Sequence, residues 1–364
     1  MNPLKELQKE GQSVWLDYIR RSLVESGELQ QMVEDDGLRG MTSNPKIFMK
    51  AITGSDEYDD KIRELISKDR NIKTRDLYEA IAVNDIRAAA DVLRPVYDQT
   101  EGADGFVSLE VSPHLAYDTE KTIEEARHLW KTVDRPNLLI KVPATSEGIP
   151  AIETLLAEGI NINITLMFSL DHYEAVAQAY LRGLKRTDNP GRTASVASFF
   201  ISRITRAVDD ALDELDTDEA RSLKGKIAIA NAKVTYQRFR EIFDGEAFEG
   251  LQRRGARVQR VLWASTSTKN PDYSDVRYVE ELIGKNTVNT MQPKTFKAFR
   301  DHGRVRGATI LEDLDEAREQ LSKLAEFGID LDKITQQLQE DGVRKFREPF
   351  DELLEGLDEK RSAL

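Results

Sequence analysis

The chain has 364 residues, of which 40% are hydrophobic, and its 52 basic and 65 acidic side chains give a net charge of -13. This apolar content suffices for a large core, and the negative charge argues against nucleic acid as a partner. No apolar run approaches the roughly 18 to 20 residues that span a bilayer, so no membrane segment is expected. The chain has no cysteine, which excludes disulfides, thiol catalysis and thiolate metal sites.

Signals for export, metals and nucleotide cofactors are also missing from the sequence. The start, "MNPLKELQKEG", has no apolar stretch of the kind found in signal peptides, which predicts a cytoplasmic protein. The segments "GADG" and "GKIAIANAK" lack the spacing of phosphate-binding glycine loops. A metal centre needs clustered ligands, whereas the four histidines are scattered: His114, His128, His172 and His302. We expect neither a cofactor nor a metal.

Eight short β-like runs alternate with amphipathic helical segments. They are expected at residues 13–17, 38–42, 106–111, 138–142, 160–166, 195–200, 258–264 and 287–290. Alternating β and α units predict a parallel sheet, and no linker or change of composition divides the eight. The sequence therefore predicts an α/β fold, a (β/α)8 TIM barrel with additional N- and C-terminal helices. Residues 1–364 would form a single barrel catalytic domain, including a C-terminal helical extension from about residue 303.

Two of the helical stretches carry well-defined apolar stripes. One begins after Ser169, the expected N-cap, and has Asp171 in its first turn. Its apolar side is formed by Tyr173, Val176, Ala177, Tyr180, Leu181 and Leu184. The other, near the C-terminus, carries Phe346, Phe350, Leu353, Leu354 and Leu357. It is predicted to pack on the barrel, with a bend at Pro349.

A lysine, Lys141, stands within the apolar run of "NLLIKVPATSEG", although lysine is among the residues least often buried. Successive strand residues face opposite sides of a sheet. Ile140 and Val142 would then face the helices. The opposite face, toward the barrel axis, belongs to Leu139, Lys141 and Pro143. The lysine is therefore predicted to point into the barrel.

Polar residues of other strands face the axis by the same test. The inward sets are Trp15 with Asp17, Ser108 with Glu110, and Asn161 with Asn163 and Thr165; Ser198 and Asn44 lie toward or past the ends of the sixth and second runs. These positions fall near the carboxyl ends of strands, where barrel enzymes carry their catalytic groups.

An inward lysine among carboxylates has two interpretations. One is a structural ion pair, since charges removed from water must be paired. The other is catalytic: apolar surroundings favour the neutral amine, a nucleophile that forms a Schiff base with a ketone or aldehyde. Such chemistry also needs acid/base groups, for which Asp17 and Glu110 are candidates. Their joint arrival at strand ends beside Lys141 favours the catalytic interpretation.

The sequence resembles the transaldolases, Schiff-base aldolases of the pentose phosphate pathway. The matching segments run in family order from about residue 13 to about residue 300: "SVWLD", "GMTSNPKIF", "VSLEVSP", "LLIKVPATSEGIPAIETLLAEGININITLMFS", "SVASFFISRI" and "VLWASTSTKNP". By this resemblance Lys141 forms the Schiff base with a ketose donor, and Asp17 handles the proton of the hydroxyl beside the bond that breaks. Glu110 acts as acid/base through a water positioned by Thr165.

The resemblance also implies a set of substrate-binding residues for phosphorylated sugars: Asn44, Asn163, Ser198, Phe200, Arg203, Ser265 and Lys269. The two asparagines would bind the dihydroxyacetone portion, and Ser198 and Arg203 the phosphate. The family's second phosphate-binding arginine has no clear counterpart, and Lys269 is its expected substitute, with Ser265 nearby. Further candidates for the phosphate are Arg192, Arg206 and Lys46, although a solvated surface position explains each of them as well.

Two residues bear on whether the protein is a transferase or a simple aldolase. Fructose 6-phosphate aldolases of the superfamily typically carry a glutamine and a tyrosine where this chain has Glu110 and Phe200. The pattern here implies transfer of a dihydroxyacetone unit from sedoheptulose 7-phosphate or fructose 6-phosphate to glyceraldehyde 3-phosphate or erythrose 4-phosphate. The resemblance also implies a homodimer. The alternatives are the aldolase itself and a non-catalytic barrel scaffold.

Overall fold

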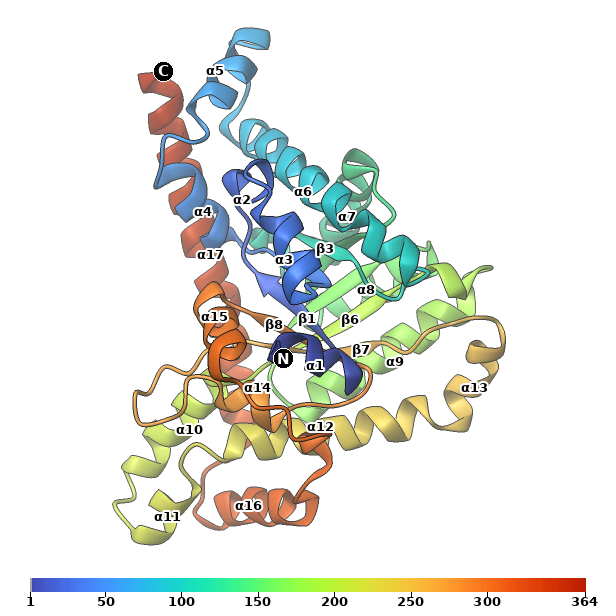
Figure 1. Ribbon diagram of the computed structural model, residues 1–364, viewed down its shortest axis with the longest axis vertical. Helices are drawn as coiled ribbons and strands as arrows, with labels where there is room; N and C mark the ends of the chain where they lie inside the picture. Colours follow the sequence, from blue (N-terminus) through green and yellow to red (C-terminus); the bar gives the residue numbers. More distant parts are fainter. Residues whose placement is uncertain (1) are drawn as a thin grey trace.

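The computed structural model describes residues 2–364, whose eight parallel strands close into a barrel (Figure 1). The strands are β1 (Gln12–Asp17), β2 (Gly40–Thr42), β3 (Phe106–Glu110), β4 (Leu138–Pro143), β5 (Ile162–Met167), β6 (Ser195–Phe200), β7 (Arg260–Ala264) and β8 (Thr287–Met291). Each strand pairs with the next in sequence, and β8 pairs with β1. The predicted (β/α)8 barrel is confirmed.

Seventeen helices lie before, between and after the strands of the described chain: α1 (Pro3–Lys9), α2 (Arg21–Glu25), α3 (Glu28–Asp36), α4 (Pro45–Thr53), α5 (Asp59–Lys68), α6 (Thr74–Gln99), α7 (Thr119–Val133), α8 (Gly148–Ala157), α9 (Leu170–Arg186), α10 (Ser202–Asp213), α11 (Asp218–Leu223), α12 (Ile227–Phe243), α13 (Glu246–Arg253), α14 (Arg277–Glu281), α15 (Pro293–His302), α16 (Leu314–Glu326) and α17 (Leu331–Ala363). Three short 3-10 helices, η1 (Pro113–Leu115), η2 (Pro190–Arg192) and η3 (Thr309–Leu311), accompany them.

The fifth strand begins two residues later than its apolar pattern predicts, and the side chain of Asn161 makes hydrogen bonds on both sides just before it. The Nδ2 atom of Asn161 donates to the carbonyls of Pro136 (3.0 Å) and Leu138 (3.1 Å). Its Oδ1 atom accepts from the backbone N–H of Ala194 at 2.8 Å. The asparagine side chain thus bridges the segments on both sides of β5, in addition to the hydrogen bond that its backbone carbonyl accepts from the N–H of Ile140 at 2.9 Å.

Helix α9 has the start and the buried side that its sequence predicts. The hydroxyl of Ser169 accepts from the backbone N–H of His172 at 3.1 Å, and Asp171 lies in the first turn. Both arrangements stabilise the positive end of a helix. The six residues of the apolar stripe are all buried.

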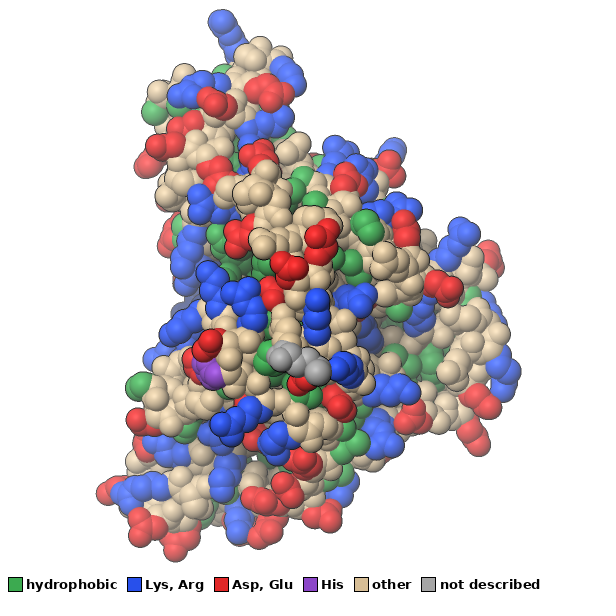
Figure 2. Space-filling view, viewed as in Figure 1, with side chains coloured by type: hydrophobic (Ala, Val, Ile, Leu, Met, Phe, Trp, Pro, Cys, Tyr) green, Lys and Arg blue, Asp and Glu red, His purple; other side chains and the backbone are tan. Residues whose placement is uncertain are grey.

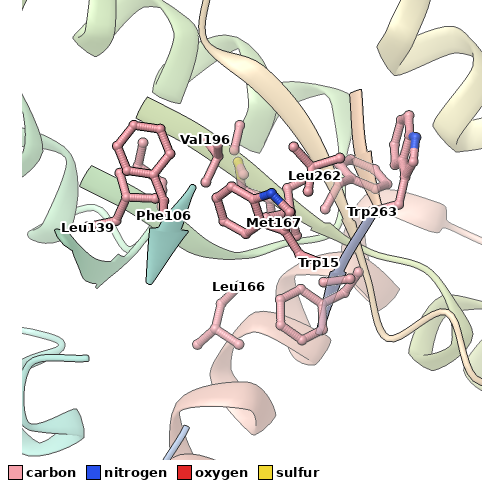
Figure 3. Close-up of a cluster of buried hydrophobic side chains, with 14 of the residues drawn as sticks. Trp15, Phe106, Leu139, Leu166, Met167, Val196, Leu262 and Trp263 are labelled. Atoms are coloured by element: carbon pink, nitrogen blue, oxygen red, sulfur yellow. The ribbon is translucent and has the colours of Figure 1, made fainter. Parts of the chain in front are cut away.

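The amino-terminal end of the barrel is closed by a tryptophan and a buried ion pair. The indole N–H of Trp15 donates to Asp104 Oδ1 at 2.8 Å, and Arg260 Nη2 lies 3.3 Å from the same oxygen. The Trp15 ring also packs against Phe106 within the cluster of buried side chains in Figure 3. A Cβ atom at Gly40 would lie 2.5 Å from this ring, so only glycine fits there. These side chains fill the amino-terminal end of the barrel.

Helix α17 packs against the carboxyl ends of strands as well as against other helices. Figure 1 shows it alongside α4, with its C-terminal end near α5. Gln339 Nε2 donates to the carbonyls of Ala144 (2.9 Å) and Leu166 (3.1 Å), which lie at the ends of β4 and β5. The helix continues through Pro349 without a break, so the proline does not interrupt it. The predicted packing of this helix on the barrel is confirmed.

The face of the molecule that Figure 2 shows carries charges of both signs. Figure 2 shows acidic and basic side chains interspersed over the visible face, with hydrophobic side chains scattered between them. The large hydrophobic residues that are exposed in the described chain are separate from one another in sequence: Tyr117, Leu215, Leu311 and Leu364. No helix within residues 2–364 combines the length and apolar character that a membrane crossing requires.

Candidate active site

Lys141 lies inside the barrel at the carboxyl end of β4, with its side chain only 6% exposed. Its Nζ atom is 3.4 Å from Glu110 Oε2 and 3.2 Å from the backbone carbonyl of Ser43. The ring centroid of Phe346, from α17, is 5.2 Å from the same nitrogen. The amine therefore contacts one carboxylate, one carbonyl and one aromatic ring, and little water reaches it.

Glu110 is the cross-strand neighbour of Lys141 in the register of β3 and β4, which explains why the two side chains meet. Burial raises the pKa of Glu110 to about 7, and the positive charge of Lys141 opposes part of this rise. A carboxyl group that titrates near neutrality can both accept and donate a proton at that pH. Glu110 has the properties of an acid/base group.

A second carboxylate, Asp17, lies at the end of β1 and faces the same space. Burial raises its pKa, and the charge of Lys141, the hydrogen bond from Thr42 and the charge of Arg203 act in the opposite direction. The Thr42 hydroxyl donates to Asp17 Oδ1 at 2.7 Å and lies 2.8 Å from the hydroxyl of Thr290. Strand β2 thus holds the Asp17 carboxylate in one orientation.

The amide of Asn163 is fixed between two serine hydroxyls. Asn163 is paired with Lys141 in the register of β4 and β5. Its Nδ2 atom donates to Ser108 Oγ at 3.0 Å, and its Oδ1 atom accepts from Ser198 Oγ at 2.7 Å. Ser198 and Asn163, both predicted site residues, therefore form one buried network beside the lysine.

Thr165 is fully buried, and its hydroxyl has no hydrogen-bond partner within the described residues. The register of β5 shifts between Ile164 and Met167, and Leu166 has a φ of 63°. Such a backbone conformation is costly for a branched side chain. The bulge leaves a free hydroxyl at the end of β5, where buried hydroxyls are normally paired. Such a group is available to a water or a substrate.

Arg203 enters the site from the start of α10, between two aromatic rings. The centre of its guanidinium group is 5.1 Å from the Phe200 ring and 5.8 Å from the Phe346 ring. Its Nη1 atom is buried and has no hydrogen-bond partner among residues 2–364. Burial lowers the pKa of Arg203, while the charges of Asp17 and Glu110 oppose this shift. A buried cation with a free donor is suited to an anionic ligand.

Asn44 caps helix α4, accepting from the backbone N–H of Ile47 at 3.1 Å. It also lines a pocket of about 210 Å³. Glu110, Ser43 and Tyr78 line the same pocket. The Oδ1 atom of Asn44 accepts this hydrogen bond, whereas its Nδ2 atom donates none within the described chain. The Nδ2 atom can therefore donate into the pocket.

Two other residues that are predicted to bind phosphate follow strand β7. Ser265 lies just after β7, in a left-handed conformation (φ 56°), and its hydroxyl is 2.8 Å from that of Ser202. Lys269 is on the exposed rim, 3.5 Å from Gln292 Oε1. Desolvation and the charges of Lys294 and Lys46 lower the pKa of Lys269. The structure therefore brings Lys269 and Lys46 near Lys294, a residue that the sequence analysis did not identify as a site residue.

Two further arginines named as phosphate candidates are on the surface. Arg192 is exposed in η2. Arg206 is 82% exposed and faces Asp210 at 3.9 Å. Within residues 2–364, neither side chain forms a hydrogen bond or ion pair with Lys141, whose polar partners are Ser43 and Glu110.

Several residues of this site are not predicted by the sequence. Thr42 and Ser43 belong to the segment "GMTSNPKIF", next to Asn44. Their place in this segment is the sequence feature that could have identified them as site residues. Phe346 and Gln339 lie about 200 residues from Lys141 in the chain, and no spacing rule connects them with it. Among residues 2–364, no group of three or more metal-binding side chains is found.

The fold and the site define a barrel enzyme of the type in which a buried lysine works beside carboxylates at the carboxyl ends of the strands. The family model described as Transaldolase/Fructose-6-phosphate aldolase matches residues 14–357, and the chain belongs to this family. It is 48% identical to a transaldolase of Frankia alni over 97% of this chain and 96% of the relative. It is also 48% identical to a transaldolase of Thiobacillus denitrificans (97% and 99% covered) and 45% identical to one of Thermobifida fusca (100% and 99% covered).

Proposed function

We propose that this protein is a transaldolase that moves a dihydroxyacetone unit between phosphorylated sugars in the non-oxidative pentose phosphate pathway. The observation that carries the proposal is the contact between the buried amine of Lys141 and Glu110, at 3.4 Å, with Asp17 facing the same space. Family membership supports it, as do the relatives named as transaldolases.

The first half of the reaction breaks a carbon–carbon bond. The Lys141 amine adds to the C2 carbonyl of the ketose, and loss of water gives an iminium ion. Asp17 takes the proton of the C4 hydroxyl, the C3–C4 bond breaks, and its electron pair moves into the iminium to form an enamine. Glu110 supplies and removes protons at the carbinolamine stage, through a water held by the Thr165 hydroxyl. The aldose phosphate then leaves.

The second half runs the same steps in reverse with a new aldehyde. The enamine attacks the carbonyl carbon of the acceptor, and Asp17 returns a proton to the new hydroxyl. Water then releases the ketose product from Lys141. Throughout, Asn44 and Asn163 donate to the hydroxyls of the three-carbon unit. The Ser108 and Ser198 hydroxyls keep the Asn163 amide oriented for this task.

Arg203 is the principal phosphate ligand in this proposal, because its buried guanidinium has a donor without a partner. Ser198 supports it through the Asn163 network rather than as a free hydroxyl, since Ser198 already donates to Asn163. Lys269 adds positive charge at the rim, together with Lys46 and Lys294, whose charges act on it. Ser265 supports the start of α10 through its contact with Ser202.

The choice of transferase over fructose 6-phosphate aldolase rests on Glu110 and Phe200. Phe200 packs against Phe168 with ring centroids 5.3 Å apart, and a phenyl ring cannot hydrogen-bond a catalytic water. We also propose that the protein is cytoplasmic, that it forms a homodimer, and that the whole chain is one catalytic domain. The packing of α17 over the ends of β4 and β5 supports the last of these.

The decisive experiment is reduction with borohydride in the presence of fructose 6-phosphate, followed by peptide mapping. A stable three-carbon adduct on Lys141 is expected. An adduct on another lysine, or none, would overturn the mechanism. Comparing transfer to erythrose 4-phosphate with release of free dihydroxyacetone then separates a transaldolase from an aldolase.

A further inference from the structure

The catalytic amine is covered by an aromatic ring that belongs to the C-terminal helix. The ring centroid of Phe346 lies 5.2 Å from Lys141 Nζ and 5.8 Å from the centre of the Arg203 guanidinium. The Phe346 residue is 8% exposed and the Lys141 residue 5% exposed. A cation over the face of an aromatic ring is attracted to it, and the attraction is larger where water is excluded.

The position of this ring is fixed by contacts on both sides of it along α17. Seven residues before Phe346, Gln339 Nε2 donates to the carbonyls of Ala144 and Leu166. Directly after it, Arg347 Nε donates to the carbonyl of Pro113 at 3.1 Å. These bonds join the helix to the carboxyl ends of β4 and β5 and to η1. The ring is therefore held at the site by backbone anchors on the barrel.

The helix also comes unusually close to the barrel at this point. A Cβ atom at Gly342 would lie 2.8 Å from Leu166 Cδ2 and 3.5 Å from Arg203 Nη1. Leu166 is the residue in the left-handed conformation within the β5 bulge. The lack of a side chain at Gly342 thus lets α17 approach closely enough for Phe346, one turn further on, to contact the amine.

We propose that Phe346 is a positioning residue that keeps water away from the nitrogen of the Schiff base and thereby favours transfer over hydrolysis. This inference rests on the proposed function. Hydrolysis of the enamine requires a proton at C3, addition of water at C2 and cleavage of the C2–Nζ bond, which releases dihydroxyacetone and the free amine. The acceptor reaction needs water at C2 only after the new carbon–carbon bond has formed. A ring against Nζ slows the first route because it keeps water from the carbon–nitrogen bond.

The test uses the full-length protein and two variants that remove the ring but keep an apolar side chain, Phe346→Leu and Phe346→Met. With fructose 6-phosphate as donor, the rate of dihydroxyacetone release without acceptor is divided by the rate of sedoheptulose 7-phosphate formation with erythrose 4-phosphate. We expect this ratio to rise about tenfold in both variants, because the smaller side chains admit water to the nitrogen. A tenfold rise corresponds to a hydrolysis barrier that is lower by about 1.4 kcal/mol. Phe346→Tyr keeps the ring face and should restore a ratio close to that of the unmodified protein.

The matched control is Leu357→Ala, three turns further along the same helix. Leu357 is fully buried, and it does not line the pocket that Asn44 and Glu110 share. This change removes a buried apolar side chain from α17, so it should lower the melting temperature and leave the ratio unchanged. A ratio that rises equally in Leu357→Ala would attribute the effect to loosening of the helix and would overturn the inference.

The remaining outcomes are also decisive. If the unmodified protein gives no borohydride adduct on Lys141, the proposed function itself fails. If that adduct forms but Phe346→Leu and Phe346→Met keep the original ratio, only the inference fails. If neither variant folds, as judged by circular dichroism, the ring is a structural element and the inference is wrong.

Discussion

Lys141 and Glu110 are cross-strand partners whose side chains meet inside the barrel, with Nζ 3.4 Å from Oε2. Both side chains are almost fully buried, at 6% and 7% exposure. A buried pair of this kind is weak evidence for stability, because the loss of hydration offsets the attraction. The pair lies at the carboxyl ends of strands, beside a second carboxylate. A catalytic role explains this arrangement better than a contribution to stability does.

Replacement of the lysine should abolish catalysis. Lys141→Met keeps an unbranched apolar side chain but removes the nucleophile, so the transfer rate should fall by more than about a thousandfold. No adduct should form with borohydride. Lys233→Met is the matched control, since Lys233 is also buried and donates to the carbonyl of Glu312 at 2.8 Å, away from the site. Lys233→Met should lose stability and still form the adduct. Residual transfer by Lys141→Met would contradict the mechanism.

The stability of the protein should depend on the ionisation of Glu110. Its pKa is about 7 in the folded chain and about 4.3 in an unfolded one. Between these values the folded state binds more protons than the unfolded state, so the free energy of unfolding falls as pH rises. The loss is complete above about pH 8 and is on the order of 3 kcal/mol.

Glu110→Gln tests this dependence, because the amide cannot ionise. The free energy of unfolding is measured by urea titration at pH 5 and pH 8. The unmodified protein should lose stability between these pH values, whereas the variant should not. The variant should therefore be more stable relative to the unmodified protein at pH 8 than at pH 5. An unchanged difference at the two pH values would exclude a raised pKa for Glu110. The transfer rate of the variant should also lose its titration near pH 7.

Thr165→Val should separate activity from stability. The Thr165 hydroxyl has no partner within the described residues, so its removal breaks no hydrogen bond between protein groups, and the free energy of unfolding should be unchanged or higher by up to about 1 kcal/mol. The transfer rate should fall by about ten- to a hundredfold if the hydroxyl holds the catalytic water. Thr42→Val makes the same change at a hydroxyl that donates to Asp17, and it should lose stability. Normal activity in Thr165→Val would remove Thr165 from the mechanism.

Arg203→Met should weaken the binding of phosphorylated substrates. Loss of a buried, charge-assisted contact with a phosphate should raise KM for fructose 6-phosphate by about a hundredfold. The effect should be much smaller with unphosphorylated fructose, which presents no anion. Arg206→Met serves as control, since Arg206 lies on the same helix with its side chain 82% exposed. Equal losses with both sugars would indicate that Arg203 supports the site structurally.

Gly342→Ala should destabilise the protein although alanine favours helices. The added methyl group would lie 2.8 Å from the buried side chain of Leu166, and overpacking of this kind typically costs about 1 to 3 kcal/mol. Gly250→Ala in α13 is the control, because the nearest heavy atom to its added methyl group is 4.0 Å away. That change should stabilise by about 0.5 to 1 kcal/mol. Thermal melts of both variants provide the measurement, and a higher melting temperature for Gly342→Ala would show that α17 has room to move.

Much of the fold could be predicted from the sequence, because its periodicities are local. The eight strands follow from short apolar runs between amphipathic helices, and the alternation of side chains along a strand turns Lys141 and Glu110 to the same side of the sheet. The first residue of β5 could not be predicted in this way. There the Asn161 side chain makes hydrogen bonds to partners that are distant in sequence.

For helix α17, the sequence predicted the packing on the barrel but not the individual contacts. Its apolar stripe predicted a helix packed on the barrel, and nothing in the stripe distinguishes Phe346, against the amine, from Phe350, against Tyr78. Which ring reaches the site is decided by the anchors of Gln339 and by the close approach at Gly342.

The sequence by itself determined the barrel, the inward lysine and the carboxylates beside it, because strand alternation and the common direction of parallel strands bring these groups to one end. Only the tertiary structure decided which groups touch: the 3.4 Å contact of Lys141 with Glu110, the free hydroxyl of Thr165, and the ring of Phe346 over the amine. The physical reason is that contacts between residues distant in the chain depend on packing and backbone geometry, such as the bulge in β5, which no local pattern records.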